Sequence, residues 1–411
     1  MKVLHLVGGD LTSGAHRGAY WLHMAQLEIG IDSILVTNGR DNLGSKSTVA
    51  LGKSTSSWMK FAALNRLGNL PTTLYRKRKP WIFNTGFAGI DFTELSEYRD
   101  ADLIHLHWIN GLVAMRTLRK VKKPIIWTIR DMWPLTGGCH YAIGCDHYQT
   151  GCGECPQLQS KHSLDLSRLI VVNKLASLPK QLQVVGISDW ISDCASKSRV
   201  FRNFRVQTIS NNIDTDVFSP LDQQTARNIL QIPENKKIIL VGAHQITNFY
   251  KGFDLFLASL KYLSLNDVHL VTFGHIDDKA LDGFKVSTTH LGHLSDTLSL
   301  RLAYSAATVF VAPSVIEAFG KTLAESLACG TPVVCFDATG PKDIVHHQVT
   351  GYKAKPFEAS DLAKGIDWVL NLSEKQYELM KARSRERAVE KFDTRVIAKQ
   401  YNRLYEEVLH E

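Results

Sequence analysis

Two carboxylates eight positions apart frame the segment of this sequence that is best suited to hold a ligand. Glu317 follows an apolar run, residues 309–312, and Glu325 lies about one and a half turns into a helical pattern that Gly320 opens. A strand, a loop and a glycine-led helix place backbone N–H groups and the positive end of a helix dipole at the carboxyl edge of a parallel sheet. This arrangement suits a phosphate or a sugar hydroxyl. The plain alternative is a loop acid and an exposed helix glutamate, since two glutamates at this spacing are common by chance.

A second chemically capable group is a cysteine cluster in the glycine-rich loop 137–157. The cluster follows the pattern C-x5-C-x6-C-x2-C and consists of Cys139, Cys145, Cys152 and Cys155. Four thiolates in such a loop suit a tetrahedral structural zinc, and His140 could replace one ligand. Reduced thiols without metal, or disulfides formed on purification, are the alternatives. Four ligands leave no open position, which argues against a catalytic zinc.

Two histidines, His105 and His107, are two positions apart near the end of the apolar run 103–106. Strand alternation places both on one face of a sheet. A histidine at a strand end could bond a substrate hydroxyl, and a structural role is equally compatible with the pattern. A metal pair is the poorer interpretation.

The chain has 411 residues, 44% of them hydrophobic, which is enough for two separate cores. Short apolar runs alternate with helical patterns twice along the chain, as in parallel α/β sheets. We therefore expect two Rossmann-like doubly wound domains that face a cleft. The expected parts are an N-terminal domain over residues 1–208, a C-terminal domain over 209–391, and a crossover helix over 392–411 that packs back across one domain.

The net charge of +8 suits an anionic partner such as a nucleotide diphosphate or a phospholipid surface. The most basic run, residues 76–79, stands beside Trp81 and is either a lipid contact or a solvated loop. Basic residues are otherwise dispersed and no nucleic-acid motif is present, so no nucleic-acid partner is expected. No apolar run approaches the roughly 20 residues of a membrane helix, and residues 1–7 are too short for a signal peptide. We expect a cytoplasmic protein, at most peripheral on the inner face of a membrane.

The segment from Glu317 to Glu325 resembles the E-x7-E motif of the retaining glycosyltransferases of GT-B fold, the large group 1 family. Residues 328–334, 349–352 and 212–218 continue the resemblance, and residues 131–141 are similar to those of bacterial colanic-acid and exopolysaccharide enzymes. The resemblance implies transfer of a sugar from a UDP- or GDP-sugar to a saccharide or lipid-linked acceptor, with retention, in surface polysaccharide synthesis. A GT-B-shaped epimerase or a non-catalytic nucleotide-sugar-binding protein is the alternative.

The resemblance also implies residue roles. Glu317 would lie against the transferred sugar, and Lys251 would stabilise the charge that grows on the leaving diphosphate. Glu325 would bind the ribose. The implied donor-binding residues are Gly14, Phe319, Gly320, Lys321, Thr322, Leu323 and Glu325. Enzymes of this fold usually need no catalytic metal, so we expect no cofactor for catalysis and, at most, a structural zinc.

The sequence departs from the family pattern at two places. Gly242, Ala243 and His244 stand where the family commonly has an arginine, and Arg130 stands where it often has a histidine. Arg130 could contact phosphate instead. Since the leaving phosphate is thought to help deprotonate the acceptor in this family, no protein base is required. The candidate catalytic residues are Glu317, Lys251, Arg130, Asp131 and His107.

Overall fold

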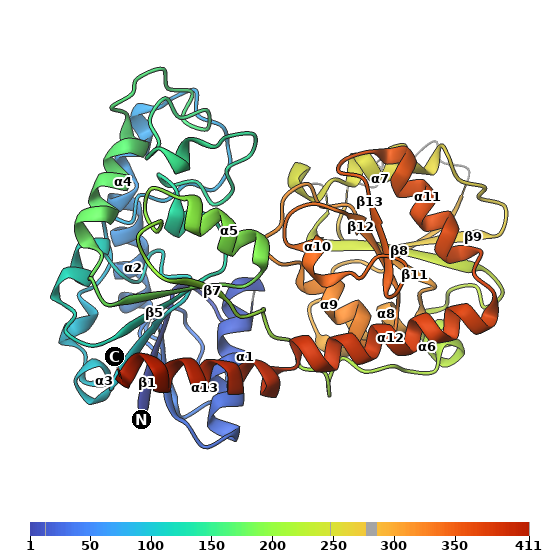
Figure 1. Cartoon of the computed structure of the whole chain (residues 1–411), viewed down its shortest axis with the longest axis horizontal. Coiled ribbons are helices and arrows are strands. Elements are labelled where there is room, and N and C mark those ends of the chain that lie inside the picture. The colour runs from blue at the N-terminus through green and yellow to red at the C-terminus, as the bar shows by residue number, and fades with distance from the viewer. Residues whose placement is uncertain (13, 247, 277–285, 411) are drawn as a thin grey trace. The chain divides into compact units, whose positions relative to one another are not determined.

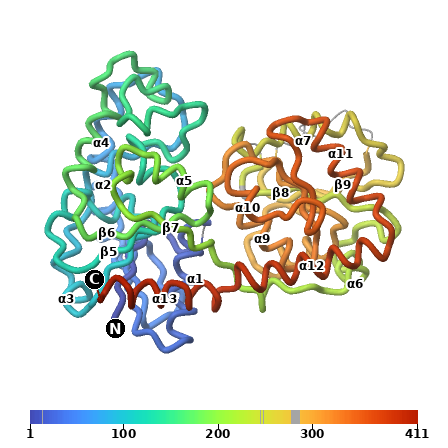
Figure 2. Tube along the Cα trace, viewed as in Figure 1, coloured from blue at the N-terminus to red at the C-terminus, as the bar shows by residue number. Residues whose placement is uncertain are grey.

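The computed structural model describes residues 1–12, 14–246, 248–276 and 286–410, and the chain divides into two compact units (Figures 1 and 2). Unit 1 comprises Met1–Asn211 and Ile397–Glu411, and unit 2 comprises Asn212–Val396. Each unit is built on its own parallel sheet with helices packed against it (Figure 1). The predicted pair of doubly wound α/β domains is confirmed.

Unit 1 contains a seven-stranded parallel sheet in the order β3-β2-β1-β4-β5-β6-β7. Its central strands are buried along their length, which explains why they read as continuous apolar runs. The strands are β1 Lys2–Val7, β2 Asp32–Thr37, β3 Thr48–Ala50, β4 Leu103–Leu106, β5 Ile125–Ile129, β6 Leu182–Gly186 and β7 Val206–Thr208. The helices are α1 Gly14–Glu28, α2 Thr55–Gly68, α3 Ser96–Asp100, α4 Leu166–Ser177 and α5 Asp189–Lys197, with short 3-10 turns at η1 Leu70–Leu74, η2 Phe92–Glu94, η3 Met115–Lys120, η4 Trp133–Leu135 and η5 His147–Gln149.

Unit 2 contains a six-stranded parallel sheet in the order β10-β9-β8-β11-β12-β13. The strands are β8 Lys237–Gln245, β9 Val268–His275, β10 Ser287–His290, β11 Val309–Ala312, β12 Val333–Phe336 and β13 Gly351–Ala354. The helices are α6 Gln223–Leu230, α7 Phe253–Leu260, α8 Thr297–Ala306, α9 Lys321–Ala328, α10 Pro341–Ile344, α11 Ala359–Leu370 and α12 Glu374–Phe392, with the 3-10 turn η6 Phe249–Lys251. Buried side chains of β8, β11, α7 and α11 form the largest part of its core.

Each sheet has one point where the strand order reverses. In unit 1 the chain builds β1 to β3 outward and then returns to place β4 on the other side of β1. In unit 2 it builds β8 to β10 and then returns to place β11 beside β8. Ligands of doubly wound sheets bind outside the carboxyl ends of the strands at such reversals. Ligand sites are therefore expected at the ends of β1 and β4, and at the ends of β8 and β11.

The last helix, α13 (Thr394–His410), begins in unit 2 and belongs to unit 1 from Ile397 onward. The apolar stripe expected from the sequence is buried, and Ile397, Tyr401 and Leu404 pack with Val3 of β1 and other side chains of the unit 1 core. Figure 1 shows α13 beside α1 and β1. The predicted packing of this helix across a domain is thus confirmed. Of the helices that the structure describes, none combines the length and apolar content needed to cross a bilayer.

Candidate functional site

A small pocket opens at the strand reversal of unit 2. The ends of β8 and β11 form its floor, and Ser314, Thr322 and Lys251 line its side. β8 runs on to Gln245, so Gly242 and Ala243 lie within the strand instead of after it. A cation, two hydroxyls and the first turn of α9 therefore meet at one place. This is the surroundings expected for an anionic group such as a diphosphate.

Lys251 and Glu317 form an ion pair beside this pocket. Their loops are joined by backbone hydrogen bonds, because the Tyr250 carbonyl accepts from the N–H of Val315 (2.9 Å). Burial lowers the pKa of Lys251, but the Glu317 carboxylate outweighs burial and the pKa is raised overall. Both side chains keep about a fifth to a quarter of their surface exposed, so a ligand can reach them.

Gly252 makes the close approach of these two loops possible. It caps η6 in the left-handed region, at φ +67°, and a Cβ there would lie 1.9 Å from the Pro313 carbonyl oxygen. Only glycine fits, since a side chain would collide with backbone and not with a movable group. The position of Lys251 is thus fixed by a residue that carries no side chain.

The loop before α9 is held from the opposite side by Gly340. The Gly340 N–H donates to the Glu317 carbonyl (2.9 Å), and a Cβ on Gly340 would lie 2.5 Å from the Ala318 carbonyl oxygen. Gly320, at φ +105°, then opens α9. Of the predicted donor residues here, Phe319, Gly320 and Leu323 are buried, whereas Lys321 and Thr322 are partly exposed.

Glu325 has a different place from the other predicted donor residues. It is 4% exposed, and one of its carboxylate oxygens accepts a hydrogen bond from the Tyr304 hydroxyl of α8 (3.0 Å). Burial and the neighbouring Glu325 carboxylate raise the pKa of Tyr304. Glu325 does not line the pocket beside Lys251. The structure thus brings Lys251, Glu317 and Thr322 together and sets Glu325 behind them.

Unit 1 has a polar pocket at its own strand reversal, over the ends of β1, β2 and β4. Amide, carboxylate and indole side chains gather there: Asp10, Asn38, Asn65, Asn84, Asn110, Trp58 and Trp108. Asn110 is 5% exposed, and neither its amide nitrogen nor its oxygen has a hydrogen-bond partner in the structure. Buried polar atoms without partners are rare in native proteins and call for an explanation such as a bound ligand or water. No sequence pattern predicts this pocket, because the residues that line it are spread between positions 9 and 111.

Arg130 lies just beyond the end of β5 in unit 1 and is 6% exposed. Its Nη1 donates to the Asn211 side chain (2.9 Å) and its Nε to Nδ1 of His107 (3.3 Å). Gly18 of α1 leaves room for it, since a Cβ there would lie 2.7 Å from Arg130 Nη1. Burial lowers the pKa of Arg130 to about 10, so it stays charged at neutral pH.

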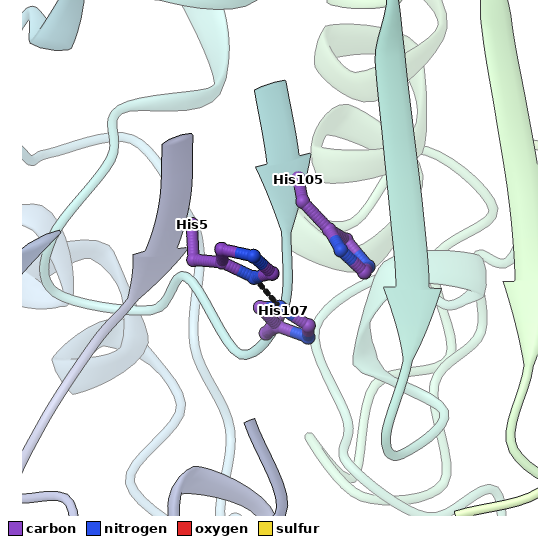
Figure 3. A group of neighbouring side chains, drawn as sticks. All are labelled: His5, His105 and His107. Atoms are coloured by element: carbon purple, nitrogen blue, oxygen red, sulfur yellow. Dashed lines mark hydrogen bonds between the residues drawn. The ribbon is translucent and has the colours of Figure 1, made fainter. Parts of the chain in front are cut away.

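The hydrogen bond from Arg130 sets the proton positions of three buried histidines, His5, His105 and His107 (Figure 3). An arginine only donates, so Nδ1 of His107 must accept, and its Nε2–H then donates to Nδ1 of His5 (2.9 Å). Nε2–H of His5 donates to Gln26, whose amide donates to the Tyr405 hydroxyl. From Tyr405 the hydrogen bonds continue to Nδ1 of His105 and then to Thr128, whose hydroxyl pairs with that of Tyr401 (2.8 Å). This hydrogen-bond network therefore runs in one direction from Arg130 to helix α13 and back into the sheet.

This network argues against a metal at the three histidines, although their nitrogens lie within 4.8 Å of one another. Every ring nitrogen already has a partner, and the Arg130 cation stands next to His107. Burial, together with the nearby positive charges, lowers the pKa of all three histidines well below 6.5. They are neutral structural groups that orient Arg130. His105 and His107 do share a face, with ring centroids 4.0 Å apart.

Comparison with known proteins identifies the part of the chain that carries the Lys251 pocket. The family model described as "Glycosyl transferases group 1" matches residues 222–387. Residues 222–387, called the group 1 domain below, are thus similar to group 1 glycosyltransferases. The putative colanic acid biosynthesis glycosyl transferase WcaC of Escherichia coli is 25% identical over 256 residues, which are 59% of this chain and 60% of WcaC. The D-inositol 3-phosphate glycosyltransferase of Mycobacterium tuberculosis is 25% identical over 292 residues, 66% of this chain and 54% of the relative. The chain thus aligns with just over half of the length of these relatives.

Solved structures resemble the chain over its whole length and show the GT-B fold. Sucrose-phosphate synthase from Thermosynechococcus elongatus has a TM-score of 0.71 at 20% identity and covers 100% of both chains. Anabaena HepE, solved in complex with UDP and glucose, has a TM-score of 0.63 at 15% identity and covers 99% of each. The fold expected from the E-x7-E resemblance is confirmed.

Two further predicted site residues, Asp131 and Gly14, lie in unit 1, outside the group 1 domain. The Asp131 carboxylate accepts from His140, from the indole of Trp108 and from the Trp133 N–H. Burial raises its pKa, but these contacts, led by His140, lower it overall. Gly14, the first residue of α1, is exposed, and no atom lies within 4 Å of where its Cβ would be.

The four clustered cysteines, also in unit 1, all line one small pocket in the loop that follows Asp131. They are unpaired, and no three of their sulfurs lie within 4.8 Å of one another. His140, the predicted substitute ligand, bonds Asp131 and Asn84 instead.

Proposed function

We propose that this chain transfers a sugar from a nucleotide sugar to a saccharide or lipid-linked acceptor, with retention of configuration. The observation that carries the proposal is the Lys251–Glu317 pair at the strand reversal of the group 1 domain. A cation and a carboxylate side by side match the two ends of a donor, one a diphosphate and the other a hexose rich in hydroxyls.

The proposed chemistry follows from this geometry. The Lys251 cation and the first turn of α9 stabilise the negative charge that develops on the diphosphate as the glycosidic bond breaks. Glu317 accepts hydrogen bonds from sugar hydroxyls and holds the anomeric carbon in place. The departing phosphate oxygen takes the proton of the acceptor hydroxyl on the same face of the sugar, which accounts for retention without a protein base.

The acceptor is proposed to bind at the polar pocket of unit 1. Amide side chains can donate to and accept from hydroxyls, and the unpartnered Asn110 amide would gain hydrogen bonds there. Indoles such as Trp58 and Trp108 suit the apolar face of a sugar ring. This side-chain chemistry favours a hydroxyl-rich, uncharged acceptor group over a phosphorylated one.

The identity of the substrates is proposed from the relatives. HepE structures with UDP and UDP-glucose support a UDP-sugar donor, with a GDP-sugar as the alternative. The colanic acid role in the name of WcaC supports a place in bacterial exopolysaccharide or surface polysaccharide synthesis.

A cytoplasmic location, peripheral on the inner face of the membrane, is proposed from a surface segment of unit 1. Leu74 and Ile82 are 81% and 63% exposed, and the basic residues 76–78 between them are exposed as well. Apolar side chains beside lysine and arginine suit anionic head groups. Co-sedimentation with phosphatidylglycerol vesicles should fall steeply with salt and with R76E/K77E/R78E. Equal sedimentation with neutral vesicles would contradict membrane contact.

The transferase proposal is tested by thermal shift with UDP-, GDP-, ADP- and TDP-sugars, followed by turnover with the best donor. We expect a saturable shift with one nucleotide class, release of free nucleotide in the presence of a saccharide acceptor, and loss of turnover in Glu317→Gln. Donor epimerisation without transfer would support the epimerase alternative. Binding without any turnover would support the non-catalytic one.

A further inference from the structure

The cysteine pocket of unit 1 brings four thiols together in one small cavity. Cys139, Cys145, Cys152 and Cys155 all line it, together with His147. Its volume is about 20 Å³, which is room for one water-sized occupant. A cavity of this size surrounded by four thiols suits a single ion better than any organic ligand.

Backbone amides point at three of the four sulfurs. The Gly137 N–H donates to Sγ of Cys152 (3.2 Å), and the His147 N–H donates to Sγ of Cys145. Sγ of Cys155 accepts from the amides of residues 157 and 158. A neutral thiol is a weak acceptor, whereas a thiolate bound to a metal is an anion that such amides stabilise. The amide two positions after Cys145, and the amides two and three positions after Cys155, are therefore placed as supports for metal thiolates.

A buried lysine lies against the same loop. Lys174 of α4 is fully buried and donates to the carbonyls of Trp133 and Thr136, with its Nζ 3.9 Å from the centre of the Trp133 ring. In the described part of the chain no carboxylate pairs with Lys174. The acidic groups whose charge acts on it most strongly are Cys152, Cys139 and Asp131, and Asp131 is already paired with His140. Burying a cation without a counter-charge is strongly unfavourable, and burial accordingly lowers the pKa of Lys174 to about 7. The missing negative charge is available from the cysteines if they are ionised.

The loop backbone is also strained at the third cysteine. Four consecutive residues have positive φ, namely Gly151 (+104°), Cys152 (+61°), Gly153 (+97°) and Glu154 (+48°). Two of them are not glycine, and each such residue costs about 1–3 kcal/mol unless other contacts hold it. A metal bond at Cys152 would supply such a contact.

We propose that Cys139, Cys145, Cys152 and Cys155 bind one structural Zn²⁺ as thiolates, and that Lys174 supplies the counter-charge to this site. Binding releases the four thiol protons, and the site then carries two negative charges, one of which Lys174 neutralises. Tetrahedral Zn–S bonds of about 2.3 Å place the sulfurs roughly 3.8 Å apart, so the ion draws them closer than they stand in this structure. Through the Trp133 and Thr136 carbonyls, the site braces the turn that follows Arg130 and Asp131.

The first test uses the unmodified protein, purified under reducing conditions without chelators. We expect about one zinc per chain by elemental mass spectrometry and a sulfur-only shell near 2.3 Å by X-ray absorption. Titration with a mercurial should release that zinc, and its removal should lower the melting temperature. Zinc below a tenth of an equivalent after growth in zinc-supplemented medium, or disulfides within the loop, would overturn the site. This measurement does not depend on turnover, so it stands or fails apart from the proposed transferase activity.

Variants then assign the ligands and the counter-charge. Cys152→Ser should lose the zinc, whereas Cys335→Ala, a buried cysteine of β12, should keep it. Lys174→Met should weaken zinc affinity about 10–100-fold in competition with a chelator, as loss of a supporting contact does at other sites. Lys180→Met, an exposed lysine a few residues further on, is the control. Unchanged affinity in Lys174→Met would remove Lys174 from the proposal, and equal loss in both cysteine variants would overturn the ligand assignment.

Discussion

Lys251 and Glu317 are the residues on which the proposed activity depends most directly. Both are partly exposed, so as an ion pair they add at most about 1 kcal/mol to stability. The pair matters more for donor binding than for stability. The diphosphate can take the lysine as its counter-ion, and the glutamate is then available to the sugar.

This exchange of partners predicts the behaviour of Lys251→Met. We expect turnover to fall about 100- to 1,000-fold, because a preorganised charge at the leaving group is lost, while the melting temperature changes little. Lys381→Met is the control, since Lys381 forms a comparable ion pair with Glu378 on α12 (2.9 Å). Steady-state kinetics of both variants check the prediction. Similar turnover in the two would remove Lys251 from the donor site.

The roles of some single residues could not be predicted from the sequence. The strand–loop–helix pattern pointed to Glu317, but Lys251 could be singled out only through resemblance to a family, because it lies 66 positions from Glu317 and no spacing rule joins the two. The histidine pattern predicted correctly that His105 and His107 share a face. It could not show that His5 and Gln26, from other elements, complete a network that leaves no ring nitrogen for a substrate.

At the scale of elements, the turn between β8 and α7 is decisive. Gly252 and Gly292 both sit in unit 2 in the left-handed region, at φ +67° and +69°, but only Gly252 faces backbone at 1.9 Å. We predict that Gly292→Ala costs about 1 kcal/mol of unfolding free energy, for conformation alone. Gly252→Ala should cost several times more and abolish donor binding. Urea denaturation and nucleotide titration compare the two, and equal effects would contradict the loop docking described above.

A second prediction at the scale of elements concerns the stability that Tyr405 of helix α13 contributes. In Tyr405→Phe, the Gln26 amide and Nδ1 of His105 lose their partner inside the core. Each unsatisfied group costs about 1–3 kcal/mol, so the variant should be clearly less stable in urea. Tyr262→Phe removes a hydroxyl from a side chain that is 66% exposed and should have almost no effect. A difference below about 1 kcal/mol between the two would mean that the network is not closed as described.

Elements with strong apolar periodicity were predictable, and those without it were not. The crossover helix expected over 392–411 matches α13 almost to its ends, because the buried stripe of this helix is regular. The neighbouring α12, Glu374–Phe392, was not predicted. Only four of its side chains are buried, Met380, Ser384, Ala388 and Phe392, and two of these are small. Charge on the remaining faces hides the helical period from a search for apolar residues.

At the scale of the whole molecule, the neutral histidines predict sensitivity to acid. The pKa values of His5, His105 and His107 lie well below 6.5 in the folded chain, and burial brings those of His16 and His23 to about 4. The unfolded chain therefore binds more protons below pH 6.5. Stability is full above that pH and is lost as the pH falls toward 4, by up to about 1.4 kcal/mol per pH unit for each such histidine.

Urea denaturation at pH 7.5, 6 and 5 checks this prediction. The midpoint should fall steeply below pH 6.5, and the slope should be smaller in His5→Gln than in the unmodified chain. His162→Gln, which alters an exposed histidine, should leave the slope unchanged. A midpoint that stays constant between pH 7.5 and 5 would contradict the neutral network.

The repeated alternation of strands and helices was enough to predict two doubly wound sheets, since central strands such as β4, β5 and β11 are buried along their whole length and appear as apolar runs. Membership of the sites was harder to predict. Asp10, Asn38 and Asn110 follow β1, β2 and β4, and they come together only because these strand ends meet at one edge of the sheet. Lys174 carried no signal either, because a lysine in a helical pattern reads as a surface residue until its burial is known.

Unit 1 is formed by two separate segments of the chain, and this affects the order in which the two units can be completed during synthesis. Its core includes residues from 397 onward, which a ribosome adds only after the whole of unit 2, about 185 residues. At about 5–20 residues per second this is a delay of roughly 10–40 s. During that time the first 211 residues wait with His105 and Gln26 lacking the hydroxyl that Tyr405 brings, 300 and 379 positions later. Unit 2 can close upon itself in the meantime, so the half that is translated first is the half that is finished last.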